Sequence, residues 1–265
     1  MSSSPTPYPD INSVLTRLLA DVRRILGDRL VGMYLDGSLG LGDFVLGRSD
    51  IDFDVVVTEL LPDNVVSALF EMHQQLAASA LPWGDELEGS YLPLEALRHL
   101  DQYIGASFPR VERSETLSVR RHDGGSLVNL YVLRENGIVL TGPAAKSLID
   151  PVSPAVLREA ALEVFANWWV PMVQDDSRLQ DDPGYQVYAV LTMCRVPYTV
   201  RFGTVAAKSV AARWGRDDLG ARWAGLIDAA LAWRNGEPFD HLGETLKMIQ
   251  YVAEEKLGFS PSGYR

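Results

Sequence analysis

The sequence has few of the residues that cross-link small folds through disulfides or metal ions: one cysteine and four histidines in 265 residues. The lone Cys194 has no partner for an internal disulfide, and neither it nor the scattered histidines show the close spacing of a zinc site. We therefore exclude disulfide-stapled and zinc-stapled scaffolds. Cys194 is expected to be a buried structural residue.

Long hydrophobic runs are also missing. No apolar stretch approaches the roughly 18 residues that a bilayer-spanning helix needs. The first residues, MSSSPTPYPDIN, lack the basic and apolar regions of a signal peptide. We therefore expect a cytoplasmic protein with no membrane partner. Its 47% hydrophobic content and its length are enough to bury the core of one large domain or two ordinary ones.

Positive charge is in short supply. The chain has 24 lysine and arginine residues against 35 aspartate and glutamate residues, which gives a net charge of -11. Such a chain repels nucleic-acid backbones and attracts cations. We expect no nucleic-acid partner and a small cationic substrate, in a protein that is a monomer or a homodimer.

Hydrophobic periodicity divides the chain into two parts. Before residue 150 it predicts helices at 10–26, 63–80 and 127–136 and strands at 29–35, 51–58, 85–94 and 138–142. In the first helix, Asp10 is the expected cap and Gly27 the expected stop. The segment 95–126 has a weak pattern, and RRHDGGS at 120–126 is typical of an exposed loop.

Beyond residue 150 only helical patterns remain, near 154–173, 184–202, 206–214, 217–233 and 240–257. An acidic loop is expected at 175–184. We predict an α/β domain at 1–152 and an all-helical domain at 153–265.

The stretch YLDGSLGLGDFVLGRSDIDFDVVV, residues 34–57, carries the chemistry. Alternate residues of a strand point to the same face, so Asp50 and Asp52 share one. Adjacent carboxylates repel each other, and Mg²⁺, which prefers hard oxygen ligands, relieves that repulsion. Asp54 continues the alternation, and a place at the solvent rim accounts for it. We predict a magnesium site at Asp50 and Asp52.

The turn GSLG that precedes these aspartates fits a phosphate. Gly37 lets the backbone approach closely, and Ser38 offers a hydroxyl and an amide at an expected helix N-terminus. A third carboxylate on a neighbouring strand would supply a base for an attacking hydroxyl. Glu88 is our candidate for that base and for a third metal ligand, and Glu86 on the same face is the alternative. A lone Asp-x-Asp is common in solvated turns, but its linkage to this turn indicates nucleotidyl or phosphoryl transfer.

At these residues the sequence resembles the nucleotidyltransferase superfamily, whose signature is Gly-Ser, a short spacer, and Asp-x-Asp on the next strand. Three further stretches resemble, in the same order, the streptomycin/spectinomycin (aminoglycoside) adenylyltransferases: LRENGIVLTGPAAKSLIDPV (133–152), AVLTMCRVPYTVRFGTVAAKSVAARW (189–214) and MIQYVAEE (248–255). The resemblance implies an α+β fold, with a polymerase-beta-like N-terminal nucleotidyltransferase domain and a C-terminal all-helical bundle.

The resemblance also implies a reaction, the transfer of AMP from Mg-ATP to an antibiotic hydroxyl. Asp50 and Asp52 would hold Mg²⁺ and the ATP phosphates with Ser38 and Ser49 beside them, and Glu88 would activate the hydroxyl. Three residues of the helical domain match residues that reach the nucleotide: Arg195, Lys208 and Tyr251. Arg195 lies among apolar neighbours, and a buried arginine needs an anionic partner. The alternative for Arg195 and Lys208 is two solvated helix cations.

The likeness thins over the antibiotic contacts, because segments 98–119 and 168–186 do not align cleanly. By chemistry alone Asp181, Asp182 and Tyr185 are candidate drug contacts, since cations favour carboxylates and aromatic faces. Trp168 and Trp169 fit a drug site or a helix core equally well. Two other functions stay open: transfer to a different small-molecule or protein hydroxyl, and a nucleotide-binding regulatory module without turnover.

Overall fold

The computed structural model of the chain describes residues 4–99, 106–112, 117–121 and 126–259. They form two compact units. The first comprises Met1–Phe44 and Ser49–Pro151, and the second comprises Val45–Arg48 and Val152–Arg265. The expected α+β combination of a sheet and a helical region is confirmed. The short segment 45–48 differs from the sequence-based division, because it groups with the second unit.

The first unit is built on a six-stranded sheet of order β5-β4-β3-β2-β1-β6. Strands β2 and β3 pair in parallel, and the other neighbours are antiparallel. The strands are β1 (Leu30–Leu35), β2 (Ile51–Val57), β3 (Leu87–Pro93), β4 (Ser107–Val111), β5 (Ser118–Arg121) and β6 (Ile138–Thr141).

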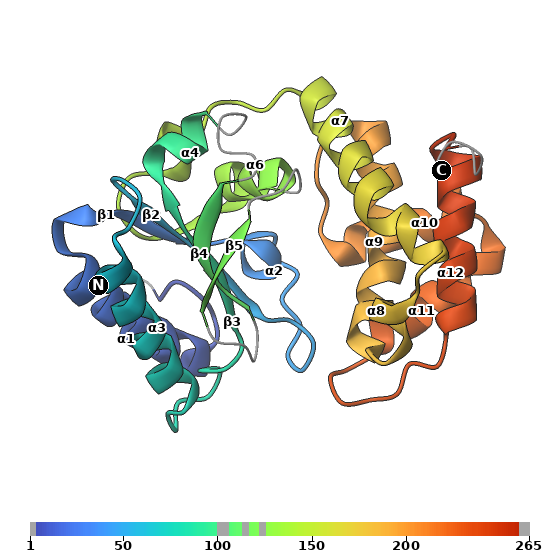
Figure 1. The fold of residues 1–265 in the computed structure, drawn as a ribbon. Helices are drawn as coiled ribbons and strands as arrows, with labels where there is room; N and C mark the ends of the chain where they lie inside the picture. The colour runs from blue at the N-terminus through green and yellow to red at the C-terminus, as the bar shows by residue number, and fades with distance from the viewer. Residues whose placement is uncertain (1–3, 100–105, 113–116, 122–125, 260–265) are drawn as a thin grey trace. The chain divides into compact units, whose positions relative to one another are not determined.

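Helices cover both faces of this sheet (Figure 1). One face packs against α1 (Pro9–Leu26) and α3 (Asp63–Ala77), and the other against α4 (Leu94–Arg98) and α6 (Ser126–Asn136). In β2, the odd-numbered residues Ile51–Val57 join the core beneath α1 and α3, whereas Val56 joins the core beneath α4 and α6. Asp52 and Asp54 therefore belong to the α4/α6 face.

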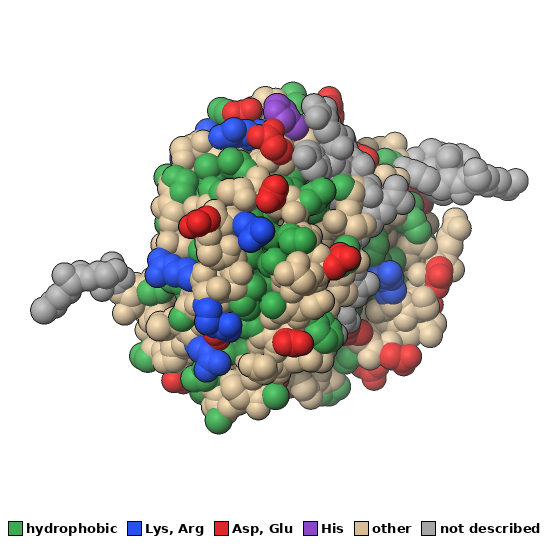
Figure 2. Space-filling model, turned by 60° about the vertical axis from the view of Figure 1, so that its left-hand side comes forward, with side chains coloured by type: hydrophobic (Ala, Val, Ile, Leu, Met, Phe, Trp, Pro, Cys, Tyr) green, Lys and Arg blue, Asp and Glu red, His purple; other side chains and the backbone are tan. Residues whose placement is uncertain are grey.

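On the surface drawn in Figure 2, acidic and basic side chains both lie scattered among hydrophobic and neutral ones. The excess of negative charge in the sequence does not appear on this face as a single acidic block. On this face, therefore, recognition of a cation has to be argued from particular carboxylates and not from net charge alone.

Helix α1 begins one residue before the expected start. Its N-cap is Tyr8, with Pro9 at the first helical position, and Asp10 lies inside the first turn without capping the helix. The expectation of Asp10 as the cap was wrong because the fixed φ of proline suits the first helical position. Gly27 ends the helix at φ 54°, as expected.

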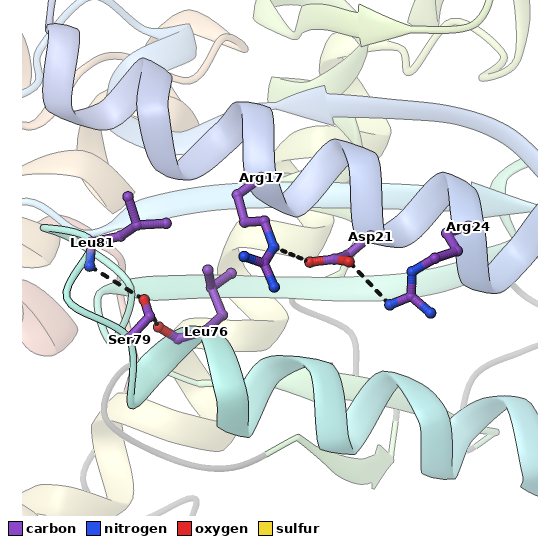
Figure 3. A network of polar contacts seen from close by, with 6 residues as sticks. All are labelled: Arg17, Asp21, Arg24, Leu76, Ser79 and Leu81. Carbon is purple, nitrogen blue, oxygen red and sulfur yellow. Dashed lines mark hydrogen bonds and ion pairs between the residues drawn. The ribbon is translucent and has the colours of Figure 1, made fainter.

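The outer side of α1 carries a small ion-pair network, shown in Figure 3. Asp21 accepts hydrogen bonds from Nε of Arg17 and, at 3.0 Å, from Nη2 of Arg24. Partial burial disfavours ionisation of Asp21, but the two hydrogen bonds outweigh this effect and hold its pKa below the ordinary value. Both arginine side chains are more than half exposed, so each pair stabilises the fold by at most about 1 kcal/mol.

Strands β4 and β5 lie in the segment whose pattern was weak. Each is five residues or shorter, and β4 contains Pro109, which cannot donate a ladder hydrogen bond and disfavours a strand prediction. The expected loop at 120–126 was wrong at both of its ends. Arg120 and Arg121 belong to β5, Ser126 begins α6, and residues 122–125 lie outside the described chain.

The second unit is helical. Its helices are α7 (Pro154–Val164), α8 (Ser177–Gln180), α9 (Pro183–Phe202), α10 (Lys208–Asp218), α11 (Ala224–Ala232) and α12 (Leu242–Tyr251). Helix α9 is its centre and packs against α7, α10, α11 and α12. Cys194 of α9 is fully buried, and burial raises the pKa of its thiol to about 12. The expected structural role of this cysteine is confirmed.

Three predictions in this unit need correction. The helix expected near 217–233 begins only at Ala224, because Asp218 ends α10 and Gly220, at φ 101°, separates the two helices. The helix expected at 154–173 ends at Val164 and continues as a π turn and then a 3-10 turn, where Pro171 lacks the N–H that an α-helix needs. The loop expected at 175–184 contains the short helix α8, anchored by the buried Leu179. No helix of the described residues is long and apolar enough to cross a bilayer.

A buried histidine makes the fold of the first unit sensitive to acid. His73 of α3 lies with Nε2 2.8 Å from the hydroxyl of Tyr91 on β3, and its ring stacks against Phe53. Burial lowers the pKa of His73 to about 4. Folding thus favours the neutral ring, whose unfolded pKa is about 6.5.

Stability from this histidine is fully present above pH 6.5 and is lost as the pH falls towards 4. We expect the free energy of unfolding to drop by about 2 kcal/mol between pH 6.5 and pH 5 on account of His73. His73→Gln should remove that part of the drop. Urea denaturation of both proteins across this range measures it, and parallel pH profiles for the two would contradict the assignment.

Candidate active site

Three carboxylates converge at the start of β2 and β3. One carboxylate oxygen from each of Asp50, Asp52 and Glu88 lies within 4.8 Å of the other two. The parallel pairing of β2 and β3 places Asp52 directly beside Glu88, and Asp50 precedes β2 by one residue. Within the described chain, no other group of three or more carboxylate, histidine or cysteine ligands has this geometry.

Glu86 is placed differently from Glu88 although both have the same parity along the strand. It comes before β3 begins, and its backbone carbonyl accepts a hydrogen bond from the amide of Ile51 at 2.9 Å. It is not a member of the group formed by Asp50, Asp52 and Glu88. The strand register thus brings Glu88, and not Glu86, opposite Asp52.

The Gly-Ser turn lies against the same carboxylates. The amide of Asp36 donates to the carbonyl of Asp52 at 3.2 Å, and Gly37 follows with φ 49°. A Cβ at Gly37 would stand 1.8 Å from Oδ2 of Asp52, so no other residue fits without moving that carboxylate. The expected helix N-terminus at Ser38 is a single turn, α2 (Gly37–Gly40).

Ser38 supports a ligand at this turn. Its Oγ is buried and has no hydrogen-bond partner within the structure described. A buried hydroxyl without a partner is costly, and a phosphate oxygen would satisfy it. Together with three converging carboxylates, which are the hard oxygen donors that Mg²⁺ prefers, the residues present fit a magnesium–nucleotide group.

Two more aspartates were not recognised as part of this cluster from the sequence. Asp54 is half-buried, and burial raises its pKa to about 6 despite the opposing effect of Arg110. Burial, with repulsion from Asp54 and Asp52, raises the pKa of Asp36 well above its ordinary value. The alternation Tyr34, Asp36 at the end of β1 was the signal that could have identified Asp36.

The three candidate nucleotide-binding residues of the second unit lie on different elements. Arg195 is half-buried in α9 between the buried Cys194 and Val196. Lys208 begins α10, with Nζ 5.1 Å from the ring centre of Tyr188. Tyr251 ends α12, where the guanidinium of Arg222 covers its ring at 3.9 Å.

The candidate drug contacts of the second unit have identifiable structural roles. Asp182 caps α9 by accepting the amide of Tyr185 at 2.9 Å, and Asp181 is exposed just before it. The hydroxyl of Tyr185 accepts a hydrogen bond from Nε1 of Trp168 at 2.7 Å. Trp169 is buried in the helical core, whereas Trp168 is 38% exposed.

Comparison with known proteins finds relatives that match this chain over most of its length. Residues 147–257 match the family model described as the aminoglycoside adenylyltransferase C-terminal domain. The chain is similar to aminoglycoside adenylyltransferases over most of its length. The aminoglycoside (3'') (9) adenylyltransferase of Escherichia coli is 28% identical over 91% of each chain, and the spectinomycin 9-adenylyltransferase of Staphylococcus aureus is 24% identical over 82% of each.

A solved structure shares the fold. The crystal structure of spectinomycin adenyltransferase AAD(9) from Enterococcus faecialis, with ATP and spectinomycin, superposes with a TM-score of 0.70 at 17% sequence identity. The match covers 91% of this chain and 98% of that one. The resemblance inferred from the sequence motifs is confirmed by these comparisons.

The contact between Gly37 and Asp52 yields a test of the site. We expect the added methyl group of Gly37→Ala to push the Asp52 carboxylate out of place. Divalent-cation binding should then weaken by about 10–100-fold, the usual cost of disturbing the residues that orient a metal ligand. Electron paramagnetic resonance of bound Mn²⁺ measures the affinity. Gly42→Ala is the matched control, because Gly42 also has positive φ, 67°, but a methyl group there would meet no described atom within 4 Å. Equal affinities in the two variants would rule out this contact as the organiser of the site.

Proposed function

We propose that this protein transfers AMP from Mg-ATP to a hydroxyl of an aminoglycoside or aminocyclitol antibiotic, of the streptomycin or spectinomycin type, and so confers resistance. The observation that carries the proposal is the convergence of Asp50, Asp52 and Glu88 beside the Gly37–Ser38 turn. The relatives supply the acceptor class, since they are named for aminoglycosides and spectinomycin. ATP is a cytoplasmic reagent, so we expect the protein to act there.

The residues of the first unit divide the work of the reaction. Asp50 and Asp52 hold Mg²⁺, with Glu88 as a third ligand or as the neighbouring base, and Ser38 and Ser49 bind phosphate oxygens beside them. Bound Mg²⁺ neutralises the charge of the phosphates. Gly37 leaves room for the carboxylate of Asp52 and for the close approach of the triphosphate.

Glu88 acts on the acceptor. Its carboxylate takes the proton of the acceptor hydroxyl, the oxygen attacks the α-phosphorus of ATP, and the bond to the β-phosphate breaks as pyrophosphate leaves. Catalysis of this kind rests on positioning and on charge neutralisation. The pairing of Glu88 with Asp52 across two hydrogen-bonded strands supports such positioning, because both side chains stand on a rigid part of the sheet.

Residues of the second unit complete the assignment by resemblance. We assign Arg195 and Lys208 to the ATP phosphates, one as a planar fork and the other as a point charge, and Tyr251 to the nucleotide. Asp181, Asp182 and Tyr185 are assigned to the cationic acceptor. For Asp182 and Tyr185 the helix cap and the bond to Trp168 are existing structural roles that a drug contact would have to share.

The test is pyrophosphate release from Mg-ATP with spectinomycin, streptomycin and neutral polyols as acceptors. We expect release with at least one of the two drugs and none with the polyols. Glu88→Gln should keep the affinity for ATP and lower turnover by about 10²–10⁴-fold, the usual contribution of a general base. Glu86→Gln is the matched control and should retain turnover. If the wild-type protein modifies neither drug, this acceptor class is excluded. An equal loss of turnover in both variants would show that Glu88 is not the base.

A further inference from the structure

The face of the sheet that carries the candidate site extends beyond the residues assigned so far. Tyr34 pairs with Asp54, Asp54 with Ser90, and Ser90 with Arg110 across β1, β2, β3 and β4. Arg110 therefore stands on the same face as Asp54. Its guanidinium lies close enough to Asp54 and Asp36 to oppose the rise in the pKa of both carboxyl groups, which agrees with that placement.

Glu112 also lies on this face, on the side of Glu88 opposite Asp52. Gly89 pairs with Val111 in the antiparallel register of β3 and β4, so the next residue after β4, Glu112, comes opposite Glu88. Its carboxylate lies 3.4 Å from Nε of Arg110, which confirms that both side chains share one face. The result is an acidic row across four neighbouring strands: Asp36, Asp52, Glu88 and Glu112.

The order of the strands separates two sides of this row. β1 and β2 supply the Gly37–Ser38 turn and the two aspartates that we assign to Mg²⁺ and the nucleotide. β3 supplies Glu88, and β4 lies on the opposite side of β3 from β2. In-line attack puts the incoming oxygen and the departing pyrophosphate on opposite sides of the α-phosphorus. We therefore place the acceptor on the β4 side of Glu88, away from the strands assigned to the nucleotide.

We propose that Glu112 is a specificity-determining residue that binds an ammonium group of the acceptor close to the hydroxyl that reacts. The inference rests on the proposed function. The side chain of Glu112 is 35% exposed, so a ligand can reach it, and it is not one of the grouped carboxylates Asp50, Asp52 and Glu88. A charge-assisted hydrogen bond to an ammonium group would hold the neighbouring hydroxyl against Glu88.

This role accounts for a charge arrangement that the metal does not need. Glu112 adds a carboxylate on the strand next to Glu88, where it pairs with Arg110 at 3.4 Å. A protonated amine that approaches Glu88 meets two carboxylates on adjacent strands. A neutral alcohol of the same shape cannot form these charge-assisted hydrogen bonds, so the row favours cationic acceptors.

The experiment compares wild type with Glu112→Gln in steady-state transfer of AMP to spectinomycin, an aminocyclitol with secondary amines. We expect the KM for spectinomycin to rise about tenfold, while kcat and the KM for ATP change by less than about twofold, because a ground-state contact to the acceptor is lost. Glu112→Asp, which keeps the charge, should restore much of the loss. Glu95→Gln, a change of the same charge on the exposed side of α4, is the control and should leave all three constants unchanged.

The pH dependence separates this role from a merely structural one. The ratio of the spectinomycin KM values of Glu112→Gln and wild type should fall towards one as the pH rises past the pKa of the drug's amines, because the ammonium group then disappears. An unchanged KM, a ratio that does not depend on pH, or a loss confined to kcat would overturn the inference while leaving the proposed function intact. Absence of transfer by wild type would instead remove the proposed function, and the inference with it.

Discussion

The parallel pairing of β2 with β3 is the constraint on which the site depends. It places Asp52 beside Glu88 on the neighbouring strand, and a carboxylate oxygen of Asp50 lies within 4.8 Å of one from each of them. Such proximity of carboxylates is unfavourable unless a cation or a proton intervenes. The hydrogen-bonded ladder holds them together nonetheless, because moving either residue would break a strand whose other face is buried against α1 and α3.

The alternation of side chains along β2 gives the two faces of the sheet different properties. One face of β2 is wholly apolar and supplies core stability, and the other changes along the strand from the buried Val56 to Asp54 and Asp52. A register slip of one residue would exchange these faces and bury the aspartates beneath α1 and α3. Site and core are therefore specified by a single pattern, and the close approach of Gly37 to Asp52 fixes the nucleotide side of the cluster.

Much of this could be predicted from local pattern. The strand IDFDVVV, the helices around it and the shared face of Asp50 and Asp52 follow from periodicity alone. The choice between Glu86 and Glu88 does not, because both have the same parity and only the pairing with β2 distinguishes them. Strands β4 and β5 were missed because both are short and β4 contains Pro109. The placement of Arg110 and Glu112 beside the site was missed with them. Contacts set by strand order have no local signature.

The central claim is that Asp50 and Asp52, with Glu88 beside them, form a divalent-cation site at the junction of β2 and β3. Its most direct test is a crystal structure of the protein soaked with Mn²⁺ and a non-hydrolysable ATP analogue, with anomalous diffraction measured at the manganese edge. The account predicts an anomalous peak within about 2.0–2.4 Å of carboxylate oxygens of Asp50 and Asp52, with triphosphate oxygens completing the coordination shell. A nucleotide bound with its cation held by other residues, and no peak between these aspartates, would contradict it.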